Sequence, residues 1–247
     1  MTTLENDRLA PSQAPAKAPQ RLVWDWPVRL FHWSLVLSIL GAFVTNRLGV
    51  KYFAYHVWFG YAVLALVGFR VLWGVLGPHH ARFANFLRGP KAVLGYVSAL
   101  GRGRRTRYAG HNPLGALMVV ALLALIALQA TFGLFANDEI FNAGPLAGLV
   151  SKPLSLGLTS LHRKIFYWIA AAIAVHVIAV VAHVRLKREN IILAMITGRK
   201  PAHLVQPGEA IPSSRSLHAV ALFVTVVAAL AVLLQFAPPA DADIGGF

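Results

Sequence analysis

The stretch LHRKIFYWIAAAIAVHVIAVVAHVRL, Leu161–Leu186, decides the fold because it is long, apolar and carries histidines. An α-helix needs about 20 apolar residues to cross the hydrocarbon core of a membrane. Within this stretch His162 and His176 are fourteen residues apart. That spacing is close to four helical turns, so the two residues share one face at about 21 Å axial separation. Because ionisable residues inside a membrane are costly and usually functional, the stretch predicts a transmembrane helix with two functional imidazoles at two depths.

Four further apolar runs accompany this helix: Val28–Thr45, Tyr52–Leu76, Asn112–Phe135 and Leu217–Phe236. The whole chain is 57% hydrophobic and only 13% charged, whereas a soluble domain is roughly 25% charged. We therefore expect an all-α integral membrane protein. A four-helix transmembrane bundle is expected over residues 28–186, followed by a fifth, C-terminal transmembrane helix over 217–237. The other segments are expected to be a disordered cytoplasmic tail at 1–27, a basic cytoplasmic connector at 187–216 and a periplasmic tail at 238–247.

Lys and Arg residues fall mostly in alternate loops between the apolar runs. Four occur up to Arg29, one is Arg70, seven lie in 77–110 and six in 185–215, which makes eighteen of the 23 on one side of the membrane. Cytoplasmic loops are enriched in Lys and Arg. The chain is therefore predicted to be a multi-pass protein of the bacterial inner membrane, with its N-terminus in the cytoplasm and its C-terminus in the periplasm. A nucleic-acid partner is not expected, because such binding needs basic residues on one folded face.

The chain contains no cysteine. This excludes structural disulfides, cysteine-ligated iron–sulfur clusters, thiolate zinc sites and covalent c-type heme attachment. Any such centre has to belong to a partner protein.

Histidines in two other helices can pair with those of the quoted helix. His32 lies near the cytoplasmic end of the first predicted helix, at the depth of His176, and His56 begins the second helix on the outer side, at the depth of His162. An iron with two axial imidazoles needs one from each of two facing helices. Two such pairs predict a diheme b-type cytochrome with these four residues as metal ligands. His183, two turns beyond His176, is a rival ligand for the inner iron, and otherwise lies near the inner heme edge or a quinone.

Other residues are expected to surround the two hemes. Gly60 lies one turn beyond His56 on the same face, where a missing side chain gives a flat macrocycle room. Arg29 and Arg70 are candidates to pair with the propionates of the inner heme, and Arg163 with those of the outer heme. The alternative is that small residues only let helices approach closely and that cations only extend to the membrane interface. The same two interpretations apply to Gly41, Gly68, Gly133, Arg47, Lys51 and Lys164.

The remaining five histidines lie in or beside predicted cytoplasmic loops: His79, His80, His111, His203 and His218. For these an exposed or interfacial side chain is expected rather than a ligand.

Several motifs occur in a fixed order: Arg29-Leu-Phe-His32-Trp33, His56 with Gly60, Arg70-Val-Leu-Trp-Gly-Val-Leu-Gly-Pro followed by Ala81-Arg82-Phe83, Gly110-His111-Asn112-Pro113, and His162 with His176. Together they resemble the bacterial cytochrome b561 family, which includes the b-type cytochrome subunits of membrane-bound nickel–iron hydrogenases. The resemblance covers about Arg21–Lys200. It implies a four-helix bundle with two b hemes on His32, His56, His162 and His176. It also implies electron exchange with quinone and with a redox partner protein, such as a c-type cytochrome, a hydrogenase or another dehydrogenase subunit.

Two other functions compete with electron transfer: a histidine-lined metal or ion transporter, and a heme-free membrane anchor of a redox complex. Transporters often contain inverted repeats and broken helices, and neither is visible in the sequence. A heme-free anchor leaves the histidine spacing unexplained. We therefore expect an electron-transfer subunit of a quinone-linked oxidoreductase, in contact with membrane lipid, and we also consider a homodimer.

Overall fold

The computed structural model describes residues 19–104, 106–140 and 142–237. Its long helices are α1 (Trp26–Arg47), α2 (Phe53–Leu76), α5 (Pro113–Leu134), α6 (Lys152–Lys187) and α8 (Ser216–Gln235). Each is long and apolar enough to cross a membrane. Each of these five helices overlaps one of the five predicted runs, which confirms a mostly helical chain with five candidate membrane spans.

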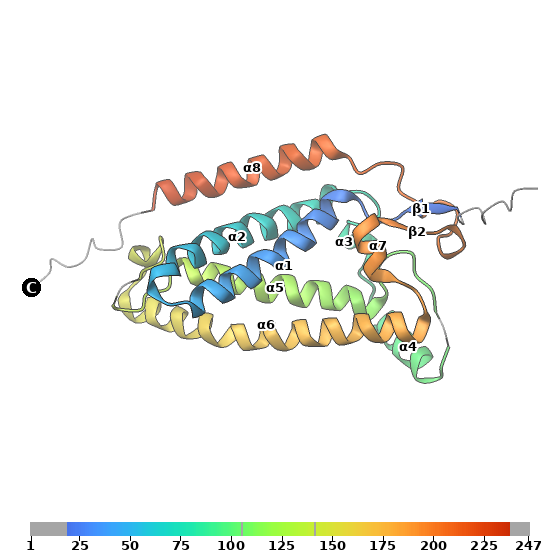
Figure 1. Cartoon of the computed structure of the whole chain (residues 1–247), viewed down its shortest axis with the longest axis horizontal. Helices are drawn as coiled ribbons and strands as arrows, with labels where there is room; N and C mark the ends of the chain where they lie inside the picture. Colours follow the sequence, from blue (N-terminus) through green and yellow to red (C-terminus); the bar gives the residue numbers. More distant parts are fainter. Residues whose placement is uncertain (1–18, 105, 141, 238–247) are drawn as a thin grey trace, which may run out of the picture.

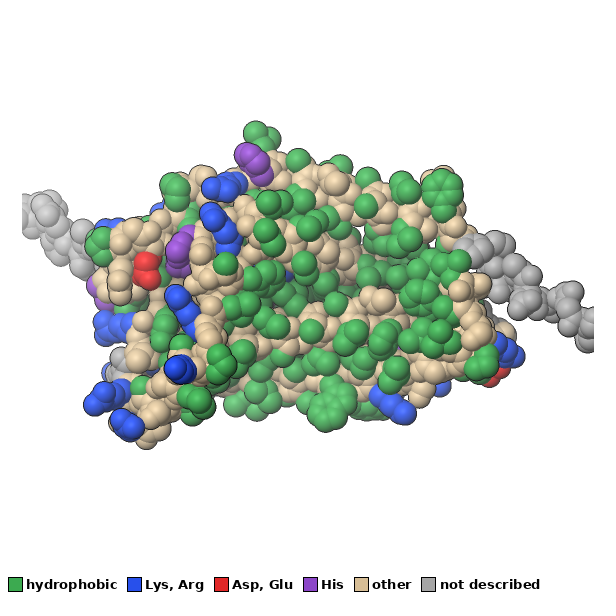
Figure 2. Space-filling model, turned by 180° about the vertical axis from the view of Figure 1, so that it is seen from behind, with side chains coloured by type: hydrophobic (Ala, Val, Ile, Leu, Met, Phe, Trp, Pro, Cys, Tyr) green, Lys and Arg blue, Asp and Glu red, His purple; other side chains and the backbone are tan. Residues whose placement is uncertain are grey.

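The long helices run side by side along the long axis of the molecule (Figure 1). Helix α1 packs against α2, α5 packs against α6, and α2 also contacts α5. Helix α8 lies on the outside, against α2 and more weakly α1. Most exposed large side chains are apolar, and they cover the middle of the molecule in Figure 2, as expected for helices that face lipid.

Side-chain caps set where two of these helices begin. The Asp25 carboxylate accepts a hydrogen bond from the backbone N–H of Val28 at 2.7 Å, and Pro27 stands in the first turn of α1. Asn112 accepts from the backbone N–H of Gly115 at 2.9 Å and starts α5. An N-cap oxygen satisfies one of the backbone donors that a helix leaves unpaired at its start.

Helix α6 begins at Lys152, so the helix start predicted at Leu161 was wrong. The additional turns contain polar residues that hid them from the hydropathy pattern. Ser155 Oγ donates to the carbonyl of Phe135 at 2.7 Å, and Thr159 Oγ1 donates to the carbonyl of Asn137 at 3.1 Å. These bonds attach the start of α6 to the loop that follows α5.

The strands and the short α-helices gather at one end of the molecule, which we call the basic end because Lys and Arg side chains collect there (Figure 2). They are strands β1 (Gln20–Leu22) and β2 (Arg199–Pro201) and helices α3 (Phe83–Phe86), α4 (Pro90–Gly101) and α7 (Ile191–Thr197). The strands pair antiparallel, with Arg21 opposite Lys200. Short 3-10 turns occupy Val50–Tyr52, Ala147–Leu149 and Ala202–Leu204.

The expected disordered tail at 1–27 was therefore wrong for its last part, because residues 20–22 form a strand and Asp25 caps α1. Residues 1–18 and the predicted tail at 238–247 lie outside the described residues. The connector expected at 187–216 contains α7 and β2. A three-residue strand leaves no pattern in the sequence, and its partner lies far along the chain.

Candidate functional site

The first pair of facing histidines, which we call the inner pair, lies toward the basic end. It consists of His32 on α1 and His176 on α6. Their ring centroids are 6.5 Å apart, and the rings are tilted by 52° to each other. The sequence predicted His32 and His176 at the same depth in the membrane, and the structure places their rings next to each other.

The outer pair lies toward the opposite end and consists of His56 on α2 and His162 on α6. Their ring centroids are 6.2 Å apart and the rings are nearly perpendicular, at 85°. The Nδ1 atom of His56 lies 2.8 Å from the carbonyl oxygen of Ala42, and that of His162 lies 2.7 Å from the carbonyl oxygen of Gln129. Since a carbonyl only accepts, each Nδ1 carries the hydrogen, and each Nε2 keeps its lone pair.

The separation of both pairs matches two imidazoles on one metal ion. Metal–nitrogen bonds of about 2 Å to each ring place the ring centroids roughly 6 Å apart. Within residues 19–104, 106–140 and 142–237, no group of three or more His, Asp or Glu side chains gathers as a metal site. A metal held at either pair therefore needs most of its ligands from a cofactor, as a heme iron does.

Several buried nitrogen atoms of the described chain, toward the basic end where the inner pair lies, have no hydrogen-bond partner. Among the described residues, Nδ1 of His32, Nε of Arg29 and both Nη atoms of Arg70 are buried without a hydrogen-bond partner. The Arg70 side chain is only 2% exposed. Nearby Asp25 is engaged by the Val28 N–H and, at 3.4 Å, by the indole N–H of Trp73. A buried donor without an acceptor is costly, so this cluster fits an anionic group such as a heme carboxylate.

His111 belongs to the same cluster, although it was expected to be exposed or interfacial. Its ring packs against Trp24 and Phe86, with centroid distances of 4.7 Å and 4.6 Å, and its Nδ1 is a further buried atom without a partner in the described chain. Burial, followed by the nearby charge of Arg70, lowers the pKa of His111 to about 3. His111 is therefore neutral at ordinary pH. The cap at Asn112, directly after it, is the sequence feature that fixes its position at the start of α5.

His80 was also expected to be exposed or interfacial, and that too was wrong. It is 7% exposed, and its Nε2 lies 2.7 Å from the carbonyl oxygen of Glu209. Gly110 makes room for it, because a Cβ there would lie 2.7 Å from His80 Nδ1. The other three histidines of this group are exposed, as expected: His79, His203 and His218.

The glycines near the pairs divide into two kinds. A Cβ on Gly60 would meet nothing within 4 Å, although the residue is half-buried. A Cβ on Gly41 would collide with the ring of Phe59, and one on Gly133 would lie 3.1 Å from the His162 ring. A Cβ on Gly68 would lie 3.1 Å from Val226 of α8. Close packing thus accounts for Gly41, Gly68 and Gly133, whereas Gly60 borders open space beside the outer pair.

The cations at the opposite end are exposed rather than buried: Arg47, Lys51, Arg163 and Lys164. The Arg47 guanidinium lies 5.3 Å from the ring centroid of Phe43, and Lys51 Nζ lies 5.8 Å from that of Tyr52. Arg163 and Lys164 line a surface cavity together with Asn137 and Thr159. The outer pair therefore lacks the buried cationic cluster that marks the inner pair.

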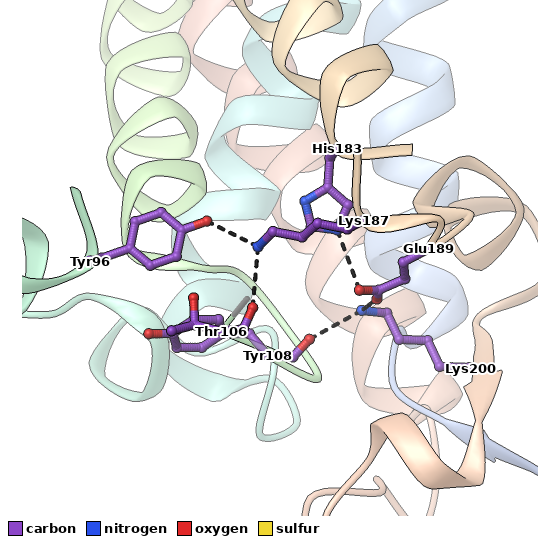
Figure 3. A network of polar contacts seen from close by, with 7 residues as sticks. All are labelled: Tyr96, Thr106, Tyr108, His183, Lys187, Glu189 and Lys200. Atoms are coloured by element: carbon purple, nitrogen blue, oxygen red, sulfur yellow. Dashed lines mark hydrogen bonds and ion pairs between the residues drawn. The ribbon is translucent and has the colours of Figure 1, made fainter. Parts of the chain in front are cut away.

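His183 is held by a polar network at the basic end (Figure 3). Its Nε2 lies 3.3 Å from Oε2 of Glu189, whose Oε1 lies 2.6 Å from Nζ of Lys200. Burial alone would raise the pKa of Glu189, but hydrogen bonds from His183 and Lys200 lower it to about 2. The carboxylate is therefore ionised and holds His183. These contacts favour His176 over His183 as the partner of His32.

Comparison with known proteins identifies the family to which this arrangement of histidines belongs. The sequence profile of prokaryotic cytochrome b561 matches residues 23–198, which include both histidine pairs. The chain is 24% identical over 212 residues to the probable Ni/Fe-hydrogenase B-type cytochrome subunit of Cupriavidus necator, a match that covers 71% of this chain and 85% of that protein. No solved structure matches the chain.

Proposed function

The chain belongs to the prokaryotic cytochrome b561 family, and on that premise we propose that it is a diheme b-type cytochrome that carries electrons within the membrane between quinone and a redox partner protein. The family implies a b-type heme. The number of hemes is our inference from the two histidine pairs, each with ring centroids near 6 Å apart and at different depths along α6. That spacing is the observation that carries the proposal.

The inner heme is assigned to His32 and His176, and the outer heme to His56 and His162. A bound b heme supplies one-electron redox chemistry, which axial ligands, burial and hydrogen bonding tune. At the outer pair the carbonyls of Ala42 and Gln129 hold each imidazole through Nδ1, so each Nε2 keeps its lone pair for coordination. The side-chain amide nitrogen of Gln129 lies 3.3 Å from Nε2 of His162 and would give up this contact when the imidazole coordinates. Backbone acceptors of this kind fix the tautomer and orientation of metal-bound histidines.

Residues around each pair have separate tasks in this proposal. Arg70 and Arg29 offer buried donors to heme carboxylates at the inner site, and His111 contributes a neutral, buried imidazole nearby. Gly60 leaves space beside the outer site. Val63, Ile126 and Ile169 form a buried apolar cluster of α2, α5 and α6, which excludes water from the middle of the bundle.

We assign helices α1, α2, α5 and α6 to a four-helix heme domain, with α8 as an additional span outside it. The distribution of Lys and Arg supports a cytoplasmic basic end and an inner-membrane location. Reporter fusions after Arg105 and after Gly144 test this topology. They should report opposite compartments, and the same compartment for both would contradict it.

The relative in Cupriavidus necator is a probable hydrogenase subunit, which suggests a class of partner. We propose that a hydrogenase or a comparable dehydrogenase, or a c-type cytochrome, exchanges electrons with one heme, and that quinone exchanges them with the other. Because the pairs lie at two depths, electrons would pass along α6 between the two membrane faces.

The experiment uses the purified protein with its native cofactors in liposomes. Addition of a quinol, or of a reduced partner protein, should reduce both hemes, as followed by their visible absorption. If neither quinols nor a partner protein exchanges electrons with the hemes, the quinone-linked function is wrong. Heme content measured on the same sample tests the heme assignment separately.

A further inference from the structure

Helix α4 (Pro90–Gly101) has two unlike sides. Tyr96 is buried against the protein, whereas Leu94, Val97 and Leu100 are 68%, 46% and 48% exposed. Residues three or four apart share a helix face, so these three form one apolar stripe. The other side carries a polar series that follows helical spacing: Lys91, Gly95, Ser98 and, directly after the helix, Arg102.

The position of α4 is fixed at the end of a membrane span. Lys187, the last residue of α6, donates through Nζ to the hydroxyl of Tyr96 at 3.3 Å and to the carbonyl of Thr106 at 3.2 Å (Figure 3). The same Nζ lies 5.5 Å from the Tyr96 ring centroid, and α4 also packs against α5. Figure 1 places α4 beside the end of α6, away from α8. Helix α6 has 36 residues, which at 1.5 Å per residue exceeds a hydrocarbon core of about 30 Å, so its end and α4 are expected at the level of the headgroup region.

The charge around α4 has one sign. Residues 77–110 contain seven Lys and Arg and no Asp or Glu. Four exposed cations lie in α4 or directly beside it: Arg88, Lys91, Arg102 and Arg104. The apolar stripe therefore fits an apolar layer, and the cations beside it fit an adjoining layer of negative charge.

We propose that α4 is an interfacial helix that binds anionic phospholipid, with Leu94, Val97 and Leu100 among the acyl chains and the flanking cations on the lipid phosphates. Amphipathic helices rich in Lys and Arg bind membranes by both contributions. Three apolar side chains are too few for a stable protein interface, which buries on the order of 1,000 Å² or more. The proposal goes beyond electron transfer and does not depend on the heme assignment.

The complete lack of cysteine allows single-cysteine spin labels on the full protein with its native cofactors. The probe is Val97→Cys, on the apolar stripe. The matched control is Gly95→Cys on the polar side, where a Cβ meets nothing within 4 Å. Both are reconstituted in vesicles of phosphatidylcholine alone and of phosphatidylcholine mixed with phosphatidylglycerol. An unchanged far-ultraviolet circular dichroism spectrum shows that the variants remain folded.

The measurement is the ratio of collisions with oxygen, which concentrates in lipid, to collisions with a water-soluble nickel chelate. At position 97 we expect this ratio to be several-fold higher than at position 95, and higher with phosphatidylglycerol than without it. Replacing Arg88 and Lys91 by Gln should weaken insertion into the anionic vesicles by about fivefold for each cation. High salt should act in the same direction, because it screens surface charge.

Three results would overturn the proposal. If the label at position 97 collides with the nickel chelate as often as the label at position 95, the stripe lies in water. Equal insertion in both lipid mixtures would mean an apolar anchor without anionic lipid binding. Protection of position 97 only in the presence of a co-purified subunit would make the stripe a protein-binding surface.

Discussion

The inner and outer histidine pairs have nearly the same spacing but very different surroundings. At the outer pair, backbone carbonyls hold both imidazoles, open space borders Gly60, and the nearby cations are exposed. At the inner pair, Nδ1 of His32 has no partner in the described chain, and the same is true of the buried guanidinium Nη atoms of Arg70 and of Nδ1 of His111 toward the same end of the bundle. The outer site is therefore characterised by imidazoles held by backbone carbonyls and by open space at Gly60. The inner site is characterised by buried polar and charged groups.

The two ends of the molecule also differ in how deeply their ion pairs are buried. The basic end is closed by the β1–β2 pair, α7 and the network around Glu189, in which Lys200 is 4% exposed. At the opposite end the ion pair of Lys152 with Glu139 has side chains 71% and 47% exposed. Exposed ion pairs add little stability, so the basic end is expected to be the more firmly held of the two.

The largest effect is expected from the histidines themselves. Alanine at His56 or His162 should remove one and the same heme, and alanine at His32 or His176 should remove the other, because each iron loses an axial ligand. Heme content and redox titration of the purified variants measure this. His183→Ala is the control and should retain both hemes. Loss of one heme in His183→Ala, with both retained in His176→Ala, would reverse the assignment of the inner ligand.

Filling the space beside Gly60 should affect the outer site alone. Gly60→Leu places a side chain where a Cβ now meets nothing within 4 Å, so the chain should fold but hold much less of the outer heme. Gly157→Leu on α6 is the matched control, because its Cβ also meets nothing within 4 Å. The heme content of both variants decides the matter. An unchanged heme content in Gly60→Leu would assign the glycine to helix packing only.

Removing the buried charge at Arg70 should shift the inner heme without displacing it. A cation stabilises the reduced heme, which carries one positive charge fewer, so Arg70→Gln should lower the inner potential by on the order of 60 mV, a tenfold change for one electron. The outer potential should move less, since charge effects weaken with distance. Arg163→Gln, at an exposed position, serves as the control. Equal shifts at both hemes would contradict the separate charge environments.

The smallest effect on the hemes is expected from Glu189, whose role is to close the basic end. Glu189→Gln should retain both hemes but lower the free energy of unfolding by on the order of 3 kcal/mol, since it leaves Lys200 buried without its partner. Glu139→Gln, at the opposite end, should cost less than about 1 kcal/mol. Thermal unfolding in detergent compares the two. A larger loss in Glu139→Gln would show that the opposite end is the firmer one.

The same carboxylate predicts a pH dependence. Because the pKa of Glu189 falls from 4.5 to about 2 in the folded chain, its ionised form stabilises the fold. This contribution is complete above pH 4.5 and is lost as the pH falls toward 2. The stability of the natural protein should therefore decline over this acidic window, and Glu189→Gln should show a weaker decline. Parallel declines in both proteins would contradict the assignment.

Hydropathy predicted the spans, because an apolar run is a local property of the sequence. The histidine pairs followed from the alternating direction of the spans, which places His32 at the depth of His176 and His56 at the depth of His162. The start of α6 was missed because Ser155 and Thr159 bond to a loop that precedes them by twenty residues or more. Strand β1 was missed because its partner, β2, lies near the other end of the chain. His111 was assigned to the surface because its burial depends on Trp24 and Phe86, contacts that only the folded chain creates.

The most direct test of the central proposal is the number of hemes per chain in the purified natural protein. Conversion of the heme to its pyridine complex, measured against protein concentration, should give two b hemes per chain. A redox titration of the same sample should then resolve two components, because one site is surrounded by buried charge and the other is not. One heme per chain, lost equally on replacing a histidine of either pair, would contradict the account.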